Sequence, residues 1–387
     1  MLLIPALLLL ITGTSPNPAE LHRRLDHLTV ETESRLAAVE TARQWLQAAG
    51  KKPKRDEWGA IATLVDQLES GGDPFDGQTG DLRQAYRSTV DGTLQPYRVF
   101  VPPNLEPERS YPLLVVLHGH HGDENSYFDK YRDRATGERT LLRLAEDRGY
   151  FVVAPRGRGP GSRYTDEAEQ DVLDVIDRVS ALYPIDERQI FLSGHSSGGV
   201  GTWKIGFRFA QRFAALAAVG SAFRYQPAEL SRLPLADSPA KPLLYVQGRQ
   251  DHLATNRYAA NLVDFLGPRL QNFVYKEFPD GHNSLGTTSL PTVFDFFDSV
   301  RQGDELMSSD TVSPPKLVAA ASRKRSARYR AVPKRRTVAK RTATKRIAAK
   351  RTPARHIAAR KTPSTKKPMA RRSVTPYKKG STKARKK

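Results

Sequence analysis

The chain has 387 residues, no cysteine and a formal net charge of +21 at pH 7. The absence of cysteine excludes disulfides, thiolate nucleophiles and cysteine-ligated metals, and the length allows one large domain or two modest ones. The charge is concentrated in residues 311–387, which hold 28 Lys and Arg and no Asp or Glu, so the preceding body has 34 basic against 41 acidic side chains and is mildly acidic.

The chain opens with an apolar run, Met1 to Ile11. Its length suits a signal peptide and is too short to span a bilayer, so residues 1–15 are predicted to be a signal peptide and the protein to be exported to the periplasm, the envelope or the medium. No Lys or Arg precedes the run, and Pro16 is unusual near a cleavage point. An uncut membrane tether, or a buried helix in a cytoplasmic protein, therefore stays open.

Residues 16–93 are predicted to form a helical N-terminal segment that carries no recognisable chemistry. Apolar residues recur there at helical spacing in two groups: Leu36, Val39, Trp45 and Leu46, then Trp58, Ile61, Leu64 and Val65. The helical pattern is broken at Gly71-Gly72-Asp73-Pro74.

Residues 94–305 are predicted to form a catalytic domain with a doubly wound, mostly parallel sheet. Short apolar runs follow one another there: 97–101, 113–117, 151–154, 190–192, 215–219, 243–246 and 273–275. These runs are continuous rather than alternating, as in strands buried on both faces. Amphipathic stretches separate several of them, and strands that alternate with helices indicate βαβ crossovers in an α/β fold. The order of the strands is not readable from the sequence.

Residues 306–387 are predicted to be a disordered tail of Lys, Arg, Ala, Thr and Pro. Repelling charges and few large apolar groups leave too little surface to bury against the entropy of ordering. We expect residues 311–387 to bind a polyanion (a polysaccharide, an anionic lipid or a nucleic acid) without base specificity, because neutralising phosphates releases counterions. A solvated tail that only aids solubility is the alternative.

The stretch Gly194-His195-Ser196-Ser197-Gly198 fits the pattern G-x-S-x-G between an apolar run and a helix-like run. In that context the pattern marks a strained strand-to-helix turn that exposes a serine hydroxyl. Side chains at the positions of Gly194 and Gly198 would collide with the neighbouring strand and helix. Ser196 is therefore the predicted nucleophile, beside the positive end of a helix dipole.

A serine nucleophile needs a base, and the base needs an orienting carboxylate. Asp251 follows the run at 243–246, and His282 follows the run at 273–275. Both lie after strands, at the carboxyl edge where open α/β sheets build their sites. We expect Asp251 and His282 to complete a triad with Ser196, with Asp280 as the alternative acid.

Two backbone donors should stabilise the oxyanion, and His120 N–H and Ser197 N–H are the candidates. His120 lies in the loop after the run at 113–117, between His118 and His121. Three close histidines also invite a metal hypothesis. Alternation after a strand points neighbouring side chains apart, however, so no metal and no cofactor is expected.

Five motifs carry a resemblance to a known family over residues 94 to 300. They are "PLLVVLHGHHGDENS", "FVVAPRGRG", "DVLDVIDRVSALYPIDERQIFLSGHSSGGVGTW", "YVQGRQD" and "FPDGHNS". The region resembles α/β-hydrolases, in particular poly(3-hydroxybutyrate) depolymerase-like and feruloyl-esterase-like enzymes and prolyl-oligopeptidase-type peptidases. The resemblance implies Ser196 as nucleophile, Asp251 as acid and His282 as base. Ser197 stands where many relatives have a larger side chain, and the substrate does not carry over.

The interval 220–241, where lids are often inserted, is short and holds three prolines. It favours an open cleft for small esters or for acyl groups on carbohydrate, with peptide hydrolysis as the weaker option. A polyanion-binding or nucleic-acid-binding protein with a non-catalytic hydrolase fold is a third hypothesis, which the intact triad argues against. No obligate protein partner is inferred.

Overall fold

The computed structural model describes residues 17–29, 32–49, 55–71, 73–222 and 232–313. The predicted signal peptide, most of the predicted tail and the middle of the interval at 220–241 lie outside these residues. Within the described ranges, no helix is both long and apolar enough to cross a bilayer.

Eight strands form one sheet in the order β1-β2-β4-β3-β5-β6-β7-β8. They are β1 (Gly80–Arg87), β2 (Leu94–Val101), β3 (Tyr111–Leu117), β4 (Phe151–Pro155), β5 (Ile185–His195), β6 (Ala215–Val219), β7 (Leu243–Gly248) and β8 (Phe273–Phe278). The pairs β1–β2 and β2–β4 are antiparallel, and all other neighbours are parallel. The predicted doubly wound, mostly parallel sheet is confirmed.

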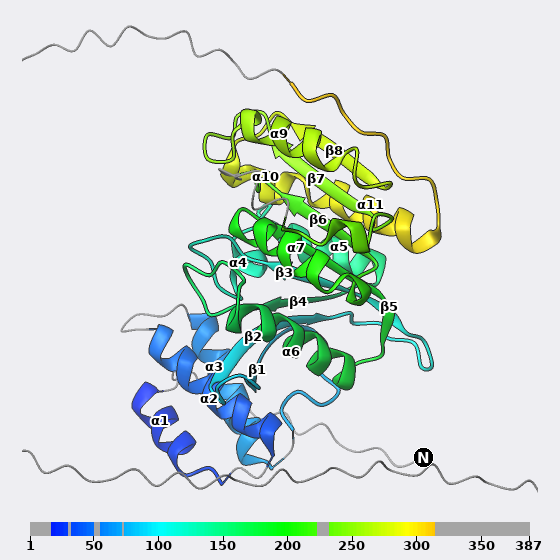
Figure 1. Ribbon diagram of the computed structural model, residues 1–387. Helices are drawn as coiled ribbons and strands as arrows, with labels where there is room; N and C mark the ends of the chain where they lie inside the picture. Colours follow the sequence, from blue (N-terminus) through cyan, green and yellow to red (C-terminus); the bar gives the residue numbers. More distant parts are fainter. Residues whose placement is uncertain (1–16, 30–31, 50–54, 72, 223–231, 314–387) are drawn as a thin grey trace, which may run out of the picture. The chain divides into compact units, whose positions relative to one another are not determined.

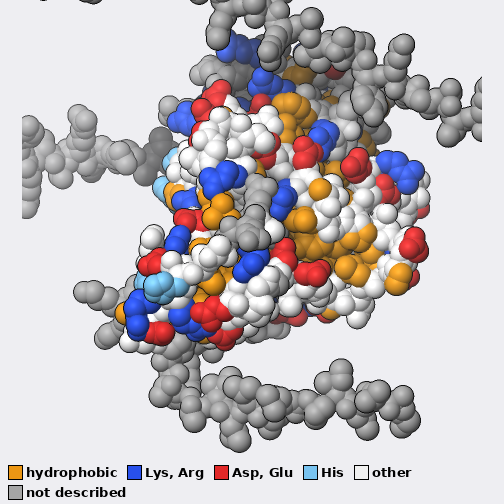
Figure 2. Space-filling view, turned by 90° about the horizontal axis from the view of Figure 1, so that it is seen from below, with side chains coloured by type: hydrophobic (Ala, Val, Ile, Leu, Met, Phe, Trp, Pro, Cys, Tyr) orange, Lys and Arg blue, Asp and Glu red, His pale blue; other side chains and the backbone are white. Residues whose placement is uncertain are grey.

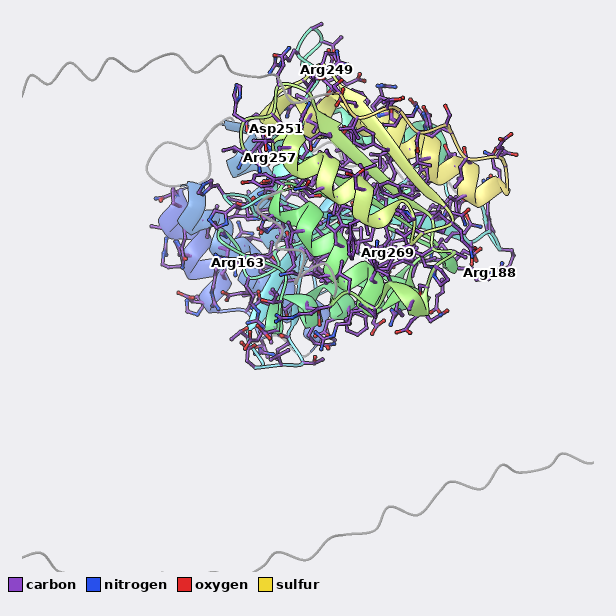
Figure 3. The ribbon with its side chains drawn as sticks, turned by 45° about the horizontal axis from the view of Figure 1, so that its top comes forward. Arg163, Arg188, Arg249, Asp251, Arg257 and Arg269 are labelled. Carbon is purple, nitrogen blue, oxygen red and sulfur yellow. The ribbon has the colours of Figure 1, made fainter. Side chains whose placement is uncertain are left out.

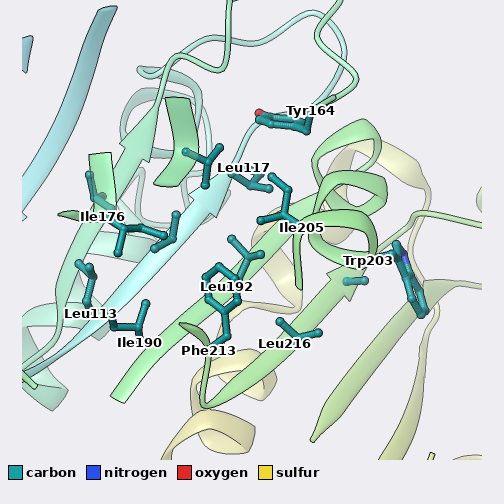
Figure 4. Close-up of a cluster of buried hydrophobic side chains, with 14 of the residues drawn as sticks. Leu113, Leu117, Tyr164, Ile176, Ile190, Leu192, Trp203, Ile205, Phe213 and Leu216 are labelled. Carbon is teal, nitrogen blue, oxygen red and sulfur yellow. The ribbon is translucent and has the colours of Figure 1, made fainter. Parts of the chain in front are cut away.

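Helices cover both faces of this sheet (Figure 1). One face packs against α6 (Glu167–Leu182), α7 (Ser197–Arg208) and α9 (Asn256–Leu266), and Figure 4 shows part of that apolar cluster. The other face packs against α4 (Ser126–Asp129), α5 (Thr140–Arg148), α10 (His282–Thr288) and α11 (Leu290–Gln302). Alternate residues of each strand serve opposite faces: Leu113 and Val115 join the first cluster, whereas Leu114 joins the second. Burial on both faces explains the continuous apolar runs.

Strand β1 corrects the prediction that residues 16–93 are helical throughout. It pairs along its whole length with β2, so the sheet begins at Gly80. As an edge strand it alternates instead of being uniformly apolar. Leu82 and Tyr86 pack on the core, while Asp81 binds the guanidinium of Arg98 across the pair. The charged residues between the apolar ones concealed the strand.

Three helices precede the sheet: α1 (Pro18–Asp26), α2 (Glu33–Ala49) and α3 (Arg55–Glu69). They bury a small apolar cluster of their own. Arg24 of α1 hydrogen-bonds Glu69 of α3 at 2.9 Å. The Arg83 guanidinium lies 4.7 Å from the ring centroid of Trp45, which joins α2 to β1. The predicted helices are confirmed.

The folded body continues past the predicted boundary at residue 305. Leu306 and Met307 pack against the apolar cluster beneath α11, and Asp310 N–H donates to Tyr275 O at 2.8 Å. The Ser313 backbone N–H donates to the Glu277 carboxylate at 3.2 Å. Residues 306–313 therefore cover the outer edge of β8, where unpaired strand groups would otherwise face solvent.

Candidate active site

The turn between β5 and α7 holds Ser196 in a strained conformation. Its φ of 61° and ψ of −123° are rare for a residue with a side chain. A Cβ on Gly194 would lie 2.3 Å from Gly198 O, and one on Gly198 would lie 1.9 Å from Leu117 O. Close approach of backbone atoms therefore requires glycine at both positions.

Ser196, Asp251 and His282 come together above the carboxyl ends of β5, β7 and β8. Ser196 Oγ lies 2.9 Å from His282 Nε2, and His282 Nδ1 lies 2.6 Å from Asp251 Oδ2. Asp251 Oδ1 accepts the N–H groups of Leu253 and Ala254, each at 2.8 Å, which fixes the carboxylate. The geometry thus allows a proton to pass from the hydroxyl to the imidazole.

Asp251 rather than the alternative acid, Asp280, is bonded to the imidazole of His282. The backbone carbonyl of Asp280 accepts the N–H of Gln250 at 2.9 Å. Asp280 therefore links the loop after β8 to the loop after β7. In Figure 3, Asp251 lies at the end of the sheet away from Arg188. This placement matches the expectation that the site forms where the parallel strands end.

A second histidine, His195, supports the base from within the elbow. Tyr131 Oη donates to His195 Nδ1 at 2.9 Å, and His195 Nε2–H donates to the backbone carbonyl of His282 at 2.8 Å. Burial, together with the nearby charge of His282, lowers the pKa of His195 to about 4. His195 is therefore neutral at pH 7. Sequence reasoning missed it because the motif accepts any residue at this position.

The loop after β3 runs beside the nucleophile, as the oxyanion prediction requires. A Cβ on Gly119 would lie 3.4 Å from Ser196 Cβ and 3.9 Å from its Oγ. The carbonyl of His120 accepts Gly161 N–H at 2.5 Å, which anchors the loop. Ser197 is the first residue of α7, where N–H groups have no partner within the helix. The oxyanion role of His120 and Ser197 stays a prediction.

The three histidines of that loop do not converge on one point. The ring nitrogens of His118 lie 2.8 and 2.7 Å from the carbonyl oxygens of Gly119 and Arg156. The rings of His120 and His121 are exposed and meet edge to face, 4.8 Å apart. Among the described residues, no group of three or more His, Asp or Glu side chains could hold a metal ion.

Ser196 and His282 line a cavity of about 1680 Å³. Its walls come from the loop at 119–122, the segment at 130–138, helix α7 and the segment at 282–291. The volume exceeds what a small ester fills, since pockets for drug-sized ligands measure roughly 300–1,000 Å³. The cavity leaves room for a substrate with a large group attached to the ester.

Residues 113–364, well over half of the chain, match the model of the alpha/beta hydrolase family. The chain therefore belongs to the α/β-hydrolase family.

Two curated relatives align with part of the chain. The bifunctional acetylxylan esterase/xylanase XynS20E of Neocallimastix patriciarum is 35% identical over 122 residues, 31% of this chain and 17% of that protein. Dipeptidyl-peptidase 5 of Porphyromonas gingivalis is 26% identical over 152 residues, 36% of this chain and 21% of that protein. The chain thus spans about a fifth of the length of these relatives.

Among solved structures, FphF, a fluorophosphonate-binding serine hydrolase of Staphylococcus aureus, aligns with a TM-score of 0.49 and 19% identity. The alignment covers 57% of this chain and 99% of that one.

Proposed function

We propose that the protein hydrolyses carboxylic esters through an acyl-enzyme formed on Ser196. The observation that carries the proposal is the continuous hydrogen-bonded chain from Ser196 Oγ through His282 to Asp251, with distances of 2.9 and 2.6 Å. Such a chain makes a weakly acidic hydroxyl nucleophilic, because the imidazole accepts the proton as the bond to carbon forms.

In the first half-reaction Ser196 Oγ attacks the ester carbonyl carbon and His282 Nε2 takes its proton. The tetrahedral intermediate places its oxyanion against the N–H groups of His120 and Ser197. The bond to the leaving oxygen then breaks, and His282 returns the proton to the departing alcohol. Water attacks the acyl-enzyme in the same way and releases the acid. Asp251 holds the His282 tautomer throughout and stabilises the imidazolium.

The alternative reaction is hydrolysis of a peptide bond, which the similarity to a dipeptidyl-peptidase favours. Ester hydrolysis is preferred here, because the relative with the higher identity carries acetylxylan esterase in its name. Acyl groups on carbohydrate are accordingly the first substrates to try. A screen that pairs 4-nitrophenyl acetate with glycyl-prolyl-4-nitroanilide separates the two reactions.

The test of the ester hydrolase uses Ser196→Ala and a matched serine variant outside the site, Ser299→Ala on α11. The wild type and Ser299→Ala should hydrolyse 4-nitrophenyl acetate at equal rates, and Ser196→Ala should lose at least about 10³-fold in kcat. A fluorophosphonate should phosphonylate Ser196 with loss of fluoride, which adds the mass of the phosphonyl group to the peptide that contains Ser196. Equal rates for all three proteins, or labelling elsewhere, would refute the proposal.

We further propose that residues 311–387 tether the enzyme to a polyanion. The support is the charge of that segment, 28 Lys and Arg without one Asp or Glu. Because residues 309–313 contact β8, the truncation that tests the tether should end at Ser313. The truncated chain should keep its esterase rate and elute from heparin at much lower salt than the full chain. Unchanged elution would contradict the tether and leave a role in solubility.

Export is the corresponding proposal for residues 1–15, supported by their apolar run. N-terminal sequencing of the protein from the cell envelope or the medium tests it. A chain that starts near residue 16 supports cleavage, and an intact Met1 recovered only from the cytoplasm contradicts export.

A further inference from the structure

The walls of the cavity are unusually rich in positive charge. Among the described residues that line it, six are Lys or Arg and only two are Asp or Glu. The cations are Lys130, Arg132, Arg134, Arg143, Arg163 and Lys204. The body of the chain is acidic overall by sequence, and the face seen in Figure 2 mixes side chains of both signs. This excess of positive charge in the cavity is therefore local and is opposite in sign to the net charge of the body.

The two acidic residues of the lining are already engaged. Glu138 pairs with Arg143 at 2.9 Å. The Asp133 carboxylate accepts the backbone N–H groups of Ala135 and Thr136 at 2.9 and 2.8 Å, and these bonds hold its pKa below the usual range. Both carboxylates stay ionised, so they offset two of the six positive charges and leave an excess of positive charge in the lining.

Several of the cations form no ion pair. Within the described part of the chain, this holds for Arg134, Arg163 and Lys204, although Lys204 also lies within the field of Glu169, a carboxylate that is itself paired with Arg208. The Arg132 guanidinium donates only to the carbonyls of Asp129 and Gly137. Unpaired cations that face one cavity create a positive potential inside it, which low-dielectric walls strengthen. A negatively charged group on the substrate would be attracted by this potential and would reduce the repulsion among the cations.

Two of these cations, Lys204 and Arg163, can be placed with respect to the nucleophile Ser196. Ser197, Val200 and Lys204 recur at helical spacing on the side of α7 that lines the cavity. With a rise of about 1.5 Å per residue, Lys204 lies roughly 12 Å along α7 from Ser196. Arg163 enters from the loop between β4 and α6, and in Figure 3 it lies on the side of Asp251, away from Arg188.

We propose that this cavity selects anionic esters, in which a carboxylate several bonds from the ester carbonyl binds Arg163 and Lys204. The inference rests on the proposed ester hydrolase and names its substrate class. A guanidinium can bind a carboxylate through two parallel hydrogen bonds, and an ammonium adds a point charge. The distance from Ser196 implies a substrate with an extended chain or ring between its ester and its acid group.

The test compares pairs of esters in which one member carries a free carboxylate and the other carries the same group as its methyl ester. One pair carries the charge on the acyl side, 4-nitrophenyl hydrogen adipate and its methyl ester. The other carries it on the alcohol side, 4-acetoxybenzoate and its methyl ester, with rates corrected for uncatalysed hydrolysis. In at least one pair the charged member should have a kcat/KM about tenfold higher at low salt, from two partly exposed ion pairs worth a few-fold each. The preference should shrink as added NaCl screens the charges.

Charge variants of the full chain assign the preference to the cavity. Arg163→Gln combined with Lys204→Gln should bring the ratio of charged to neutral ester close to one. Arg188→Gln is the matched control: it removes one charge from a side chain that is 90% exposed outside the cavity, and the ratio should not change. The chain that ends at Ser313 should also keep the ratio, which excludes attraction by the tail.

Each outcome has one meaning. Hydrolysis of both members of each pair without a charge preference overturns the inference and leaves the esterase proposal standing. A preference that survives the double variant, or disappears with the tail, also overturns the inference. Hydrolysis of none of the four esters means that the proposed ester hydrolase itself fails.

Discussion

One added methyl group in the elbow should damage the site severely. In Gly198→Ala the new Cβ would lie 1.9 Å from Leu117 O, 2.5 Å from Leu117 C and 2.7 Å from His118 O. All three are backbone atoms, so no side-chain rotation relieves the contact. The separation between α7 and the end of β3 must grow by about 1 Å, because real Cβ atoms essentially never approach within 3.0 Å.

The magnitude follows from where this displacement occurs. Overpacking a filled interior costs roughly 1–3 kcal/mol. Because β3 is a rigid strand in the middle of the sheet, Gly198→Ala should lose about 3 kcal/mol of unfolding free energy. The displaced loop is the one that carries His120, a predicted oxyanion donor. A misplacement of about 1 Å at a reacting centre can cost about 100-fold, so kcat/KM should fall by about that factor.

Urea denaturation and 4-nitrophenyl acetate hydrolysis measure the two effects separately. Gly206→Ala on the same helix is the matched control, because the three atoms nearest to its Cβ would all belong to the Leu216 side chain, the closest at 2.6 Å. That variant should lose stability and keep its activity. Gly59→Ala on α3, with open space around its Cβ, should gain up to about 1 kcal/mol in helix stability.

Two results would refute the reasoning about the elbow. A folded Gly198→Ala protein with the wild-type kcat/KM would mean that the close approach to β3 does not shape the site. Equal losses of activity in Gly198→Ala and Gly206→Ala would mean that general destabilisation, rather than displacement of the loop, explains the effect.

Three further predictions concern buried groups. In the unfolded chain His195 has its ordinary pKa of about 6.5, whereas in the folded protein its pKa is about 4. Unfolding free energy should therefore fall by about 3 kcal/mol as pH drops through that window, with a weaker slope in His195→Gln, measured by urea titration at several pH values. Asp251→Asn should lower kcat by about 10⁴-fold with a small change in KM in steady-state assays, because the imidazole loses its tautomer; a loss below tenfold would contradict the triad. Arg98→Met should cost about 3 kcal/mol by urea denaturation, the low end for breaking a buried pair, because Arg139 still binds Asp81; an unchanged midpoint would refute this.

Short-range patterns were enough to predict most of the fold. Continuous apolar runs such as 113–117 indicated strands buried on both faces, and the amphipathic stretches between such runs indicated crossover helices; β3 and α6 are examples of the two. The elbow was also predictable, since Gly194 and Gly198 flank a serine between a strand and a helix. These signals are local because burial and steric limits act on neighbours along the chain.

The missed elements are those whose pattern depends on distant partners. Strand β1 lies at the edge of the sheet, and its polar residues are satisfied by β2, as where Asp81 binds Arg98. Residues 306–313 looked like the start of the tail, yet their hydrogen bonds are to β8. Neither segment carries enough apolar residues of its own to identify it.

By itself the sequence determined the fold class, the turn that presents Ser196, and the expectation that Asp251 and His282 would follow later strands. Only the tertiary structure decided which carboxylate contacts His282 and that His195 hydrogen-bonds the backbone carbonyl of His282. It also decided that Arg163 and Lys204 line the same cavity as Ser196. The physical reason is that local conformation follows from neighbouring residues, whereas the meeting of side chains depends on strand order and helix placement, which pairing and packing across the whole domain determine.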